Sequence, residues 1–235
     1  VLIEIDGGLN RGGVKPMEHA LFFGNQVKDL PGLDIRGLMY YGGLIYNSRD
    51  KTEVEAYCKR ERDQLVETAE LLRAHGFTME VLSAGSSFSG KYPWLLEGIT
   101  EIRSGHYIFN DCGQLDVGLA QPEDCALRVV TTVVAKPDEE TVICDVGTKS
   151  LTSDMCHHRK GYGYIDQYPD MEVYALNEEH AFVRQAGGNP LRIGEKITIV
   201  PNHACVVTNL ARKVYGVRGG RLERMIPIDA RGRSE

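Results

Sequence analysis

The sequence predicts two regions of different fold class, an α/β region followed by an all-β region. Up to about residue 122, strand-like and helix-like patterns alternate, which is typical of βα units that build a parallel sheet. Beyond that point, short β-branched runs are separated by Gly, Asn and Pro, which is typical of an antiparallel sheet. We therefore expect one domain over residues 1–122 and a second over residues 123–235.

The clearest element of the first region is a long helix. Residues 50–75 carry apolar side chains at helical spacing, and His75 followed by Gly76 is a typical stop signal. The expected strands of this region are residues 1–5, 33–41, 78–82 and 106–109. Because Val1 already belongs to a strand-like run, we expect the chain to be the C-terminal portion of a longer protein.

The expected strands of the second region are short and rich in β-branched residues. They are residues 126–136, 141–146, 172–176, 180–185, 196–200 and 212–217. Turn-forming residues stand between them, so successive strands can pair in antiparallel fashion.

The composition describes a globular protein with one or two domains. The 235 residues are 42% hydrophobic and 26% charged, which excludes collagen, coiled-coil and disordered classes. A net charge of −6 argues against a nucleic-acid partner, because phosphate binding needs a basic patch. No apolar run reaches about 18 residues, so we expect no membrane span. Six cysteines without a CxxC pair favour reduced thiols and a cytoplasmic location.

A run of small residues over 83–89 is the first candidate binding element. It follows a predicted strand and contains Ser83, Gly85, Ser86 and Ser87. Backbone N–H groups and hydroxyls in such a loop can wrap a phosphate. A plain small-residue loop has the same composition, so both interpretations stay open.

A histidine and a cysteine two positions apart form the second candidate. His203 and Cys205 follow a β-type run, and strand periodicity would put both side chains on one face. Imidazole and thiolate suit zinc, and two protein ligands leave positions open for water or substrate. The alternative is a buried histidine beside a buried cysteine with no metal.

Two further polar motifs are less specific. Glu178, Glu179 and His180 precede an apolar strand, and they form either a surface loop or an acid–base group near a metal. Asp6 ends the first expected strand and opens a glycine-rich segment that carries Arg11. An arginine there could face an anionic ligand, although glycine turns with one surface arginine are common.

Taken in order, these motifs resemble one enzyme family. They are similar to pyridoxal-phosphate enzymes of the alanine-racemase type, in the metal-dependent branch that contains D-threonine aldolase and D-serine dehydratase. The resemblance rests on residues 4–6, 10–14, 37–41, 83–89, 101–111, 145–151, 178–180, 201–205, 209–210 and 229–233. It implies a partial TIM-type β/α barrel followed by a β domain of the D-serine-dehydratase type.

The resemblance also implies roles for individual residues. The cofactor pyridoxal 5′-phosphate would be held by Arg11, Tyr41, Ser83, Gly85, Ser86, Ser87, Gly105 and Tyr107. His203 and Cys205 would bind a divalent metal, with zinc favoured by the thiolate and manganese or magnesium as alternatives. Glu179 and His180 would assist catalysis. The substrate would be a small D-β-hydroxy amino acid, and the protein would form a homodimer without nucleic-acid or membrane partners.

Two departures from the family pattern bear on activity. The family carries its Schiff-base lysine in an N-terminal segment, and nothing similar is present here, so we expect this chain alone to be inactive. Leu44 stands where many relatives have histidine, which leaves aldolase and dehydratase chemistry both open. Other interpretations are a catalytically silent binding or interaction module, and a racemase-like protein that uses no metal.

Overall fold

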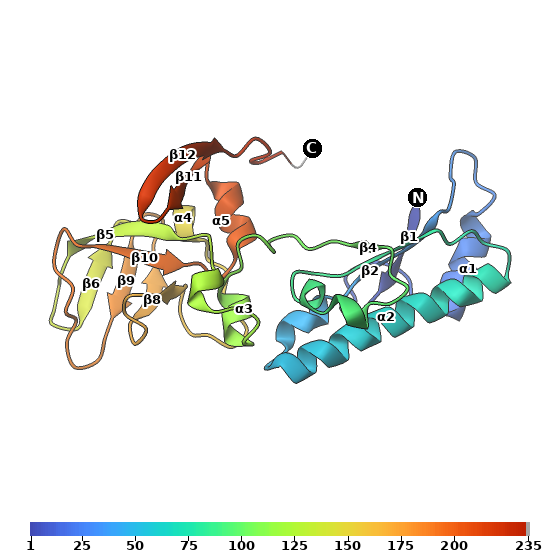
Figure 1. Cartoon of the computed structure of the whole chain (residues 1–235), viewed down its shortest axis with the longest axis horizontal. Helices are drawn as coiled ribbons and strands as arrows, with labels where there is room; N and C mark the ends of the chain where they lie inside the picture. Colours follow the sequence, from blue (N-terminus) through green and yellow to red (C-terminus); the bar gives the residue numbers. More distant parts are fainter. Residues whose placement is uncertain (234–235) are drawn as a thin grey trace. The chain divides into compact units, whose positions relative to one another are not determined.

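The computed structural model describes residues 1–233 and divides the chain into two compact units (Figure 1). The first unit comprises residues 1–107 and 117–119, and the second comprises residues 108–116 together with the chain from residue 120 onward. The predicted fold classes are confirmed, because the first unit holds a parallel sheet and the second an antiparallel one. The segment 108–116 packs with the second unit, ahead of the boundary expected near residue 122.

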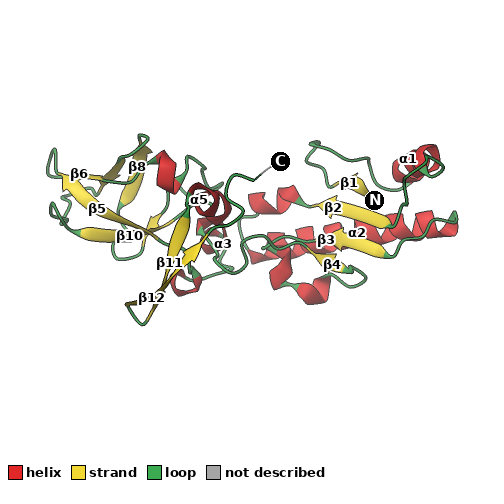
Figure 2. Ribbon diagram, turned by 90° about the horizontal axis from the view of Figure 1, so that it is seen from above, coloured by secondary structure: helices red, strands yellow, loops and turns green. Residues whose placement is uncertain are grey.

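The first unit is built on a four-stranded parallel sheet in the order β1-β2-β3-β4. Its strands are β1 (Leu2–Asp6), β2 (Gly37–Tyr41), β3 (Val81–Ala84) and β4 (Glu101–Ile102). Its helices are α1 (Glu18–Val27), α2 (Lys51–Ala74) and the 3-10 turns η1 (Gly43–Asn47), η2 (Ser89–Lys91) and η3 (Pro93–Leu95). Figure 2 shows the four strands side by side, with α2 running along the sheet.

The long helix α2 begins directly after Asp50, which caps it. The Asp50 carboxylate accepts a hydrogen bond from the Glu53 backbone N–H, which satisfies one of the unpaired groups of the first turn. Leu65, Ala69 and Leu72 are fully buried on the face of α2 that packs against the sheet. This buried face fixes the helix across the strands whose ends carry the candidate loops.

We expect Leu65→Ala to destabilise the first unit by about 2–5 kcal/mol, because the substitution removes fully buried methyl groups and leaves a cavity. Urea unfolding followed by the fluorescence of Trp94, which lies in this unit, measures the change. Leu30→Ala deletes the same atoms from a side chain that is 48% exposed and should shift stability by less than about 0.5 kcal/mol. Equal losses in the two variants would contradict this assignment of the core.

The second unit contains a six-stranded antiparallel sheet and a separate hairpin. The sheet order is β7-β10-β5-β6-β9-β8, and β11 pairs with β12. The strands are β5 (Val129–Ala135), β6 (Thr141–Cys144), β7 (Tyr164–Ile165), β8 (Glu172–Leu176), β9 (Ala181–Arg184), β10 (Lys196–Val200), β11 (Lys213–Arg218) and β12 (Arg221–Pro227). Helices α3 (Cys112–Asp116), α4 (Thr148–Leu151) and α5 (Ala204–Leu210) and the 3-10 turn η4 (Pro122–Asp124) complete it.

One predicted strand is wrong. Residues 106–109 form bends and turns, and the fourth strand of the parallel sheet is Glu101–Ile102 instead. The His106 backbone N–H donates to the Ser87 hydroxyl rather than to a neighbouring strand. The aromatic and β-branched residues of this segment therefore belong to a loop beside the sheet. His106 is buried in this loop without forming part of a strand.

Within residues 1–233, none of the helices combines the length and the apolar character that crossing a membrane requires. Over the same residues, none of the six cysteines takes part in a disulfide.

Candidate functional site

The candidate loops of the first unit follow the carboxyl ends of its parallel strands. The register pairs Asp6 with Tyr41 and Ser83 with Glu101, so the strands end at one edge of the sheet. Loops that follow such strand ends are the usual place for ligand sites in parallel α/β sheets. The predicted residues on these loops are therefore gathered at one edge.

The loop after β3 takes a conformation that needs glycine. Gly85 has φ +83°, and its backbone N–H donates to Glu61 Oε1 at 2.8 Å. A Cβ at this position would lie 2.6 Å from Ile102 Cγ2, closer than any relaxed contact. Burial raises the pKa of Glu61, whose carboxyl group lies on helix α2 behind the loop and also contacts Ser89. Glu61 is a supporting residue that no sequence motif indicates.

Two of the predicted serines, in and after strand β3, bind neighbouring protein groups. The Ser86 hydroxyl accepts the backbone N–H groups of Phe88 and Ser89, both at 3.2 Å. The Ser83 hydroxyl contacts Glu101 and the Arg103 guanidinium. Because both hydroxyls contact protein groups, we assign them a role in holding the loop conformation.

An open cavity of about 370 Å³ lies beside the loop. It is lined by Ser87, Gly90, Lys91, Ile102, Ser104 and Tyr107. The structure thus brings together two predicted residues, Ser87 and Tyr107, with a lysine and a serine that the sequence motifs did not single out. An ammonium group and hydroxyls around a small cavity suit an oxyanion such as phosphate. Gly105 is exposed on the loop between β4 and the end of the unit.

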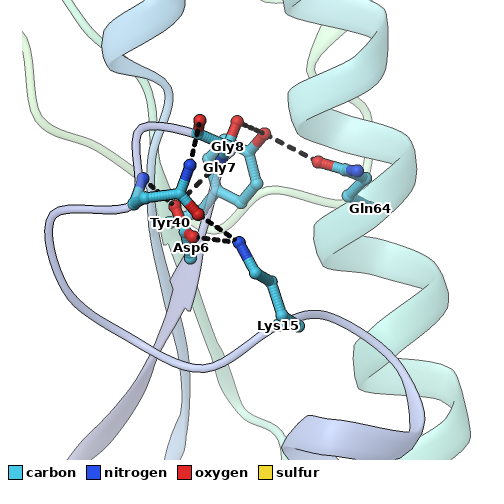
Figure 3. A network of polar contacts seen from close by, with 7 residues as sticks. Asp6, Gly7, Gly8, Lys15, Tyr40 and Gln64 are labelled. Carbon is cyan, nitrogen blue, oxygen red and sulfur yellow. Dashed lines mark hydrogen bonds and ion pairs between the residues drawn. The ribbon is translucent and has the colours of Figure 1, made fainter.

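The glycine-rich loop after β1 is fastened by Asp6, a residue that is only 8% exposed (Figure 3). Asp6 Oδ1 accepts the backbone N–H groups of Gly8 at 2.9 Å and Asn10 at 3.0 Å. Lys15 Nζ reaches Asp6 Oδ2 at 2.6 Å and Asn10 Oδ1 at 2.7 Å. The ammonium group and the two N–H groups together close the loop on itself.

The same loop presents Arg11 to the neighbouring strand. The Arg11 guanidinium carbon lies 4.2 Å from the centre of the Tyr41 ring, within range of a cation–π contact. Both predicted residues thus meet at the ends of β1 and β2. A planar cation stacked on an aromatic ring offers a flat, positively charged face to a ligand.

The Asp6 contacts predict how the stability of the folded chain changes with pH. The hydrogen bond from Lys15, with the two backbone N–H groups, lowers the pKa of Asp6 from 3.8 to about 2. A lowered pKa means that the carboxylate stabilises the folded chain fully above pH 3.8 and loses this effect as pH falls through 2. We expect Asp6→Asn to lower stability at pH 7 and the difference from wild type to shrink towards pH 2.

Urea unfolding at several pH values measures that difference. The matched control is Asp29→Asn, which removes one carboxylate from an exposed position of the same unit. A wild-type-to-variant gap that stays constant from pH 7 to pH 2 would count against the proposed role of Asp6.

In the second unit, His203 and Cys205 lie together at the start of helix α5. His203 is the residue before the first helical residue, with extended backbone angles, and Cys205 stands in the first turn. The Cys205 side chain contacts the His203 imidazole and, together with Asp154, raises the pKa of His203 to about 9. The predicted pairing therefore occurs, but strand alternation is not its cause, because a helix start brings the two side chains together.

Of the predicted metal-site residues, His203 and Cys205 are the two that the structure brings into contact. Among residues 1–233, no three His, Cys, Asp or Glu side chains are grouped so that they could hold a metal ion together. An imidazole and a thiol fit a borderline-soft divalent cation such as zinc, and a two-residue set leaves other coordination positions for small molecules.

The acidic triplet lies elsewhere on the second unit. Glu178 and Glu179 each reach Lys149 Nζ at 2.9 Å, and His180 is exposed in the turn between β8 and β9. These residues do not join His203 and Cys205 in a metal-binding group within the part of the chain that the structure describes. The structure thus places Glu179 in a surface ion pair, and its catalytic role stays a prediction.

Each half of the chain matches a known protein family. Residues 1–112 match the model of the alanine racemase N-terminal domain, and residues 126–217 match that of a putative serine dehydratase domain. The chain is 31% identical to a D-threonine aldolase of Arthrobacter sp., over 99% of this chain. It is also 31% identical to D-threo-3-hydroxyaspartate dehydratase of Delftia sp., over 87% of this chain. It spans 61% and 59% of the length of these two relatives.

Solved structures agree with these matches. The D-threonine aldolase of Filomicrobium marinum superposes with a TM-score of 0.87 at 28% identity, covering 100% of this chain and 64% of the aldolase. Two mutants of a D-threo-3-hydroxyaspartate dehydratase superpose with TM-scores of 0.85 and 0.86 at 28% identity, and this chain covers about two thirds of each, with 97% of its own residues matched. One is a cysteine-to-alanine mutant in the metal-free form, and the other is a histidine-to-alanine mutant.

The parallel sheet, the antiparallel unit and the ordered motifs agree with both family models and with these relatives along the whole chain. The chain belongs to the fold type III family of alanine-racemase-like proteins with a serine-dehydratase-like domain, the family of D-threonine aldolase and D-threo-3-hydroxyaspartate dehydratase.

Proposed function

We propose that this chain carries the phosphate-binding loops and the metal-binding pair of a pyridoxal-phosphate-dependent lyase that acts on D-β-hydroxy amino acids. The observation that carries the proposal is the contact between His203 and Cys205 at the start of α5. The substituted histidine and cysteine of the two D-threo-3-hydroxyaspartate dehydratase mutants are also two positions apart, and the cysteine mutant is in a metal-free form. The barrel assignment for residues 1–122 and the β-domain assignment for residues 123–235 belong to this proposal.

Pyridoxal phosphate, when bound, provides an electron sink for the bonds at the substrate α-carbon. In this chain, Ser87 and Tyr107 would hold its phosphate, with Lys91 adding a positive charge to the same cavity. Arg11, stacked on Tyr41, would face the ring of the cofactor. Ser83, Gly85, Ser86 and Gly105 would contribute loop shape and backbone groups.

A divalent cation, when bound, acts as a Lewis acid on the substrate hydroxyl. His203 and Cys205 would hold it, with zinc as the first choice and manganese or magnesium as alternatives. His203 and Cys205 would thereby hold the cation that binds the substrate β-oxygen. Glu179 and His180 are proposed to assist proton transfer. We also propose a cytoplasmic homodimer, for which a stable monomer in light scattering would be contrary evidence.

Assays of the natural protein that carries this chain test the function. D-Threonine, D-serine and D-threo-3-hydroxyaspartate are supplied with pyridoxal phosphate and with zinc, manganese or magnesium in turn. Aldolase chemistry would release glycine and acetaldehyde from D-threonine, whereas dehydratase chemistry would release ammonia and pyruvate from D-serine. Metal-dependent turnover of one substrate supports the proposal. Racemisation of alanine without metal would support the racemase-like alternative instead, and binding without turnover would support the silent module.

A further inference from the structure

We propose that Asp154 is a positioning residue that orients His203 so that its Nε2 atom faces the cation. This inference rests on the proposed metal-binding role of His203 and Cys205. Asp154 Oδ2 lies 2.6 Å from His203 Nδ1, a contact between segments that are 49 residues apart in the sequence. Neither family match nor sequence motif singles out this aspartate.

The chemistry of this contact determines which nitrogen of the His203 imidazole carries the proton. An ionised carboxylate has no proton to donate, so the hydrogen bond requires the proton to be on His203 Nδ1. The lone pair of a neutral imidazole then lies on Nε2, which points away from Asp154. Histidine ligands commonly have a carboxylate partner of this kind on the second nitrogen. Because the two ring nitrogens diverge, Asp154 cannot share a cation that Nε2 binds.

The backbone around Asp154 is tied to the same segment. Asn202, the residue before His203, donates from its side chain to the Asp154 carbonyl oxygen at 3.0 Å and to the Gly161 carbonyl oxygen at 2.9 Å. Asn202 is buried, with 6% of its surface exposed. The Asp154 carboxylate therefore approaches the imidazole from a loop that is anchored to the neighbouring residue.

A second carboxylate holds the backbone between the two proposed ligands. Asp111 Oδ2 accepts the Ala204 backbone N–H at 3.0 Å, and Asp111 Oδ1 accepts that of Gly113 at 3.1 Å. Asp111 is 3% exposed and also faces His203. With Asp111 fixing the turn and Asp154 fixing the ring, the orientation of His203 is determined before any cation arrives.

Metal affinity in the purified chain tests this inference without an activity assay. Zinc is titrated into wild type, Asp154→Ala, Asp154→Asn and Asp170→Ala in competition with a chromophoric chelator. We expect Asp154→Ala to weaken zinc binding about 10–100-fold. Asp154→Asn should recover most of this loss, because its carbonyl oxygen still accepts the Nδ1 proton. Asp170→Ala removes a carboxylate from an exposed turn of the same unit and should bind as wild type does.

Cobalt substitution supplies a second readout. Absorption from thiolate-bound Co²⁺ should persist at saturation in Asp154→Ala, because Cys205 still binds, but should need more cobalt. Near-ultraviolet circular dichroism confirms that each variant is folded. If wild type and Asp154→Ala bind zinc equally, the positioning role is wrong while the metal site stands. If both Asp154 variants lose metal completely, Asp154 is a ligand and the inference is overturned. If wild type binds no zinc, the proposed metal site and this inference both fall.

Discussion

Replacing His203 by alanine should remove stoichiometric zinc from the purified chain. The proposed site has two protein ligands, so losing the imidazole leaves only the Cys205 thiol, and one side chain does not retain a cation against water. The loss of affinity should exceed the about 10–100-fold change that accompanies loss of a supporting contact. Cys205→Ala should have the same effect, because the two side chains form one site.

Metal analysis after dialysis, combined with chelator competition, measures this result. His75→Ala is the matched control, because His75 is an exposed histidine at the end of α2 in the other unit. We expect the control to retain the zinc content of wild type. Zinc that persists at full stoichiometry in both His203→Ala and Cys205→Ala would place the metal elsewhere and remove the main support for the proposed function.

Replacing Gly85 by alanine should weaken binding of the cofactor phosphate. The new methyl group would lie 2.6 Å from Ile102 Cγ2 and 3.3 Å from Ile102 Cβ, on a backbone with φ +83° that non-glycine residues rarely adopt. Either the loop or strand β4 must move. Because Ser87 of the loop and Ile102 of β4 both line the cavity, we expect the phosphate affinity to fall by at least about 10-fold, the effect of a site loosened by about 1 Å.

Equilibrium dialysis with pyridoxamine phosphate measures this affinity, since the amine carries the same phosphate and forms no bond to lysine. Pyridoxamine without phosphate shows the contribution of the ring alone. Gly32→Ala is a close control, because Gly32 has φ +82° but a methyl group there would meet no atom within 4 Å. Combining Gly85→Ala with Ile102→Ala should restore part of the affinity. If Gly32→Ala and Gly85→Ala are equally harmless, the loop does not form the phosphate site.

The elements that the sequence predicts well are those whose signal is local. Helix α2 shows its apolar spacing and its stop within one stretch of chain, predicted as residues 50–75, and the structure places it at Lys51–Ala74. The strands β8 and β10 begin and end where their β-branched runs do. Residues 106–109 have strand-like composition but lie in turns, because the parallel sheet pairs Glu101 with Ser83 and leaves the next residues to the loop.

The candidate site depends on contacts that a linear pattern does not contain. The sequence pairs His203 with Cys205 through strand alternation, whereas a helix start is the actual cause. Lys91 lines the cavity because the turn η2 directly follows the serine-rich loop. Its position two residues beyond the 83–89 run was the sequence feature that could have indicated it as a phosphate-binding residue. Glu61 contacts Gly85, which is 24 residues away in the sequence, and Asp154 contacts His203, which is 49 residues away. Such contacts are seen only once the fold is known.

The cysteines of this chain differ sharply in their access to solvent. Cys58, Cys112, Cys125 and Cys144 are buried, Cys156 is half-buried, and Cys205 is exposed at the start of α5. A thiol-directed alkylating reagent would therefore reach Cys205 first, and a cation held by that sulfur would shield it. The rate of alkylation at this position would then report occupancy of the site directly, in crude extracts as well as in purified material.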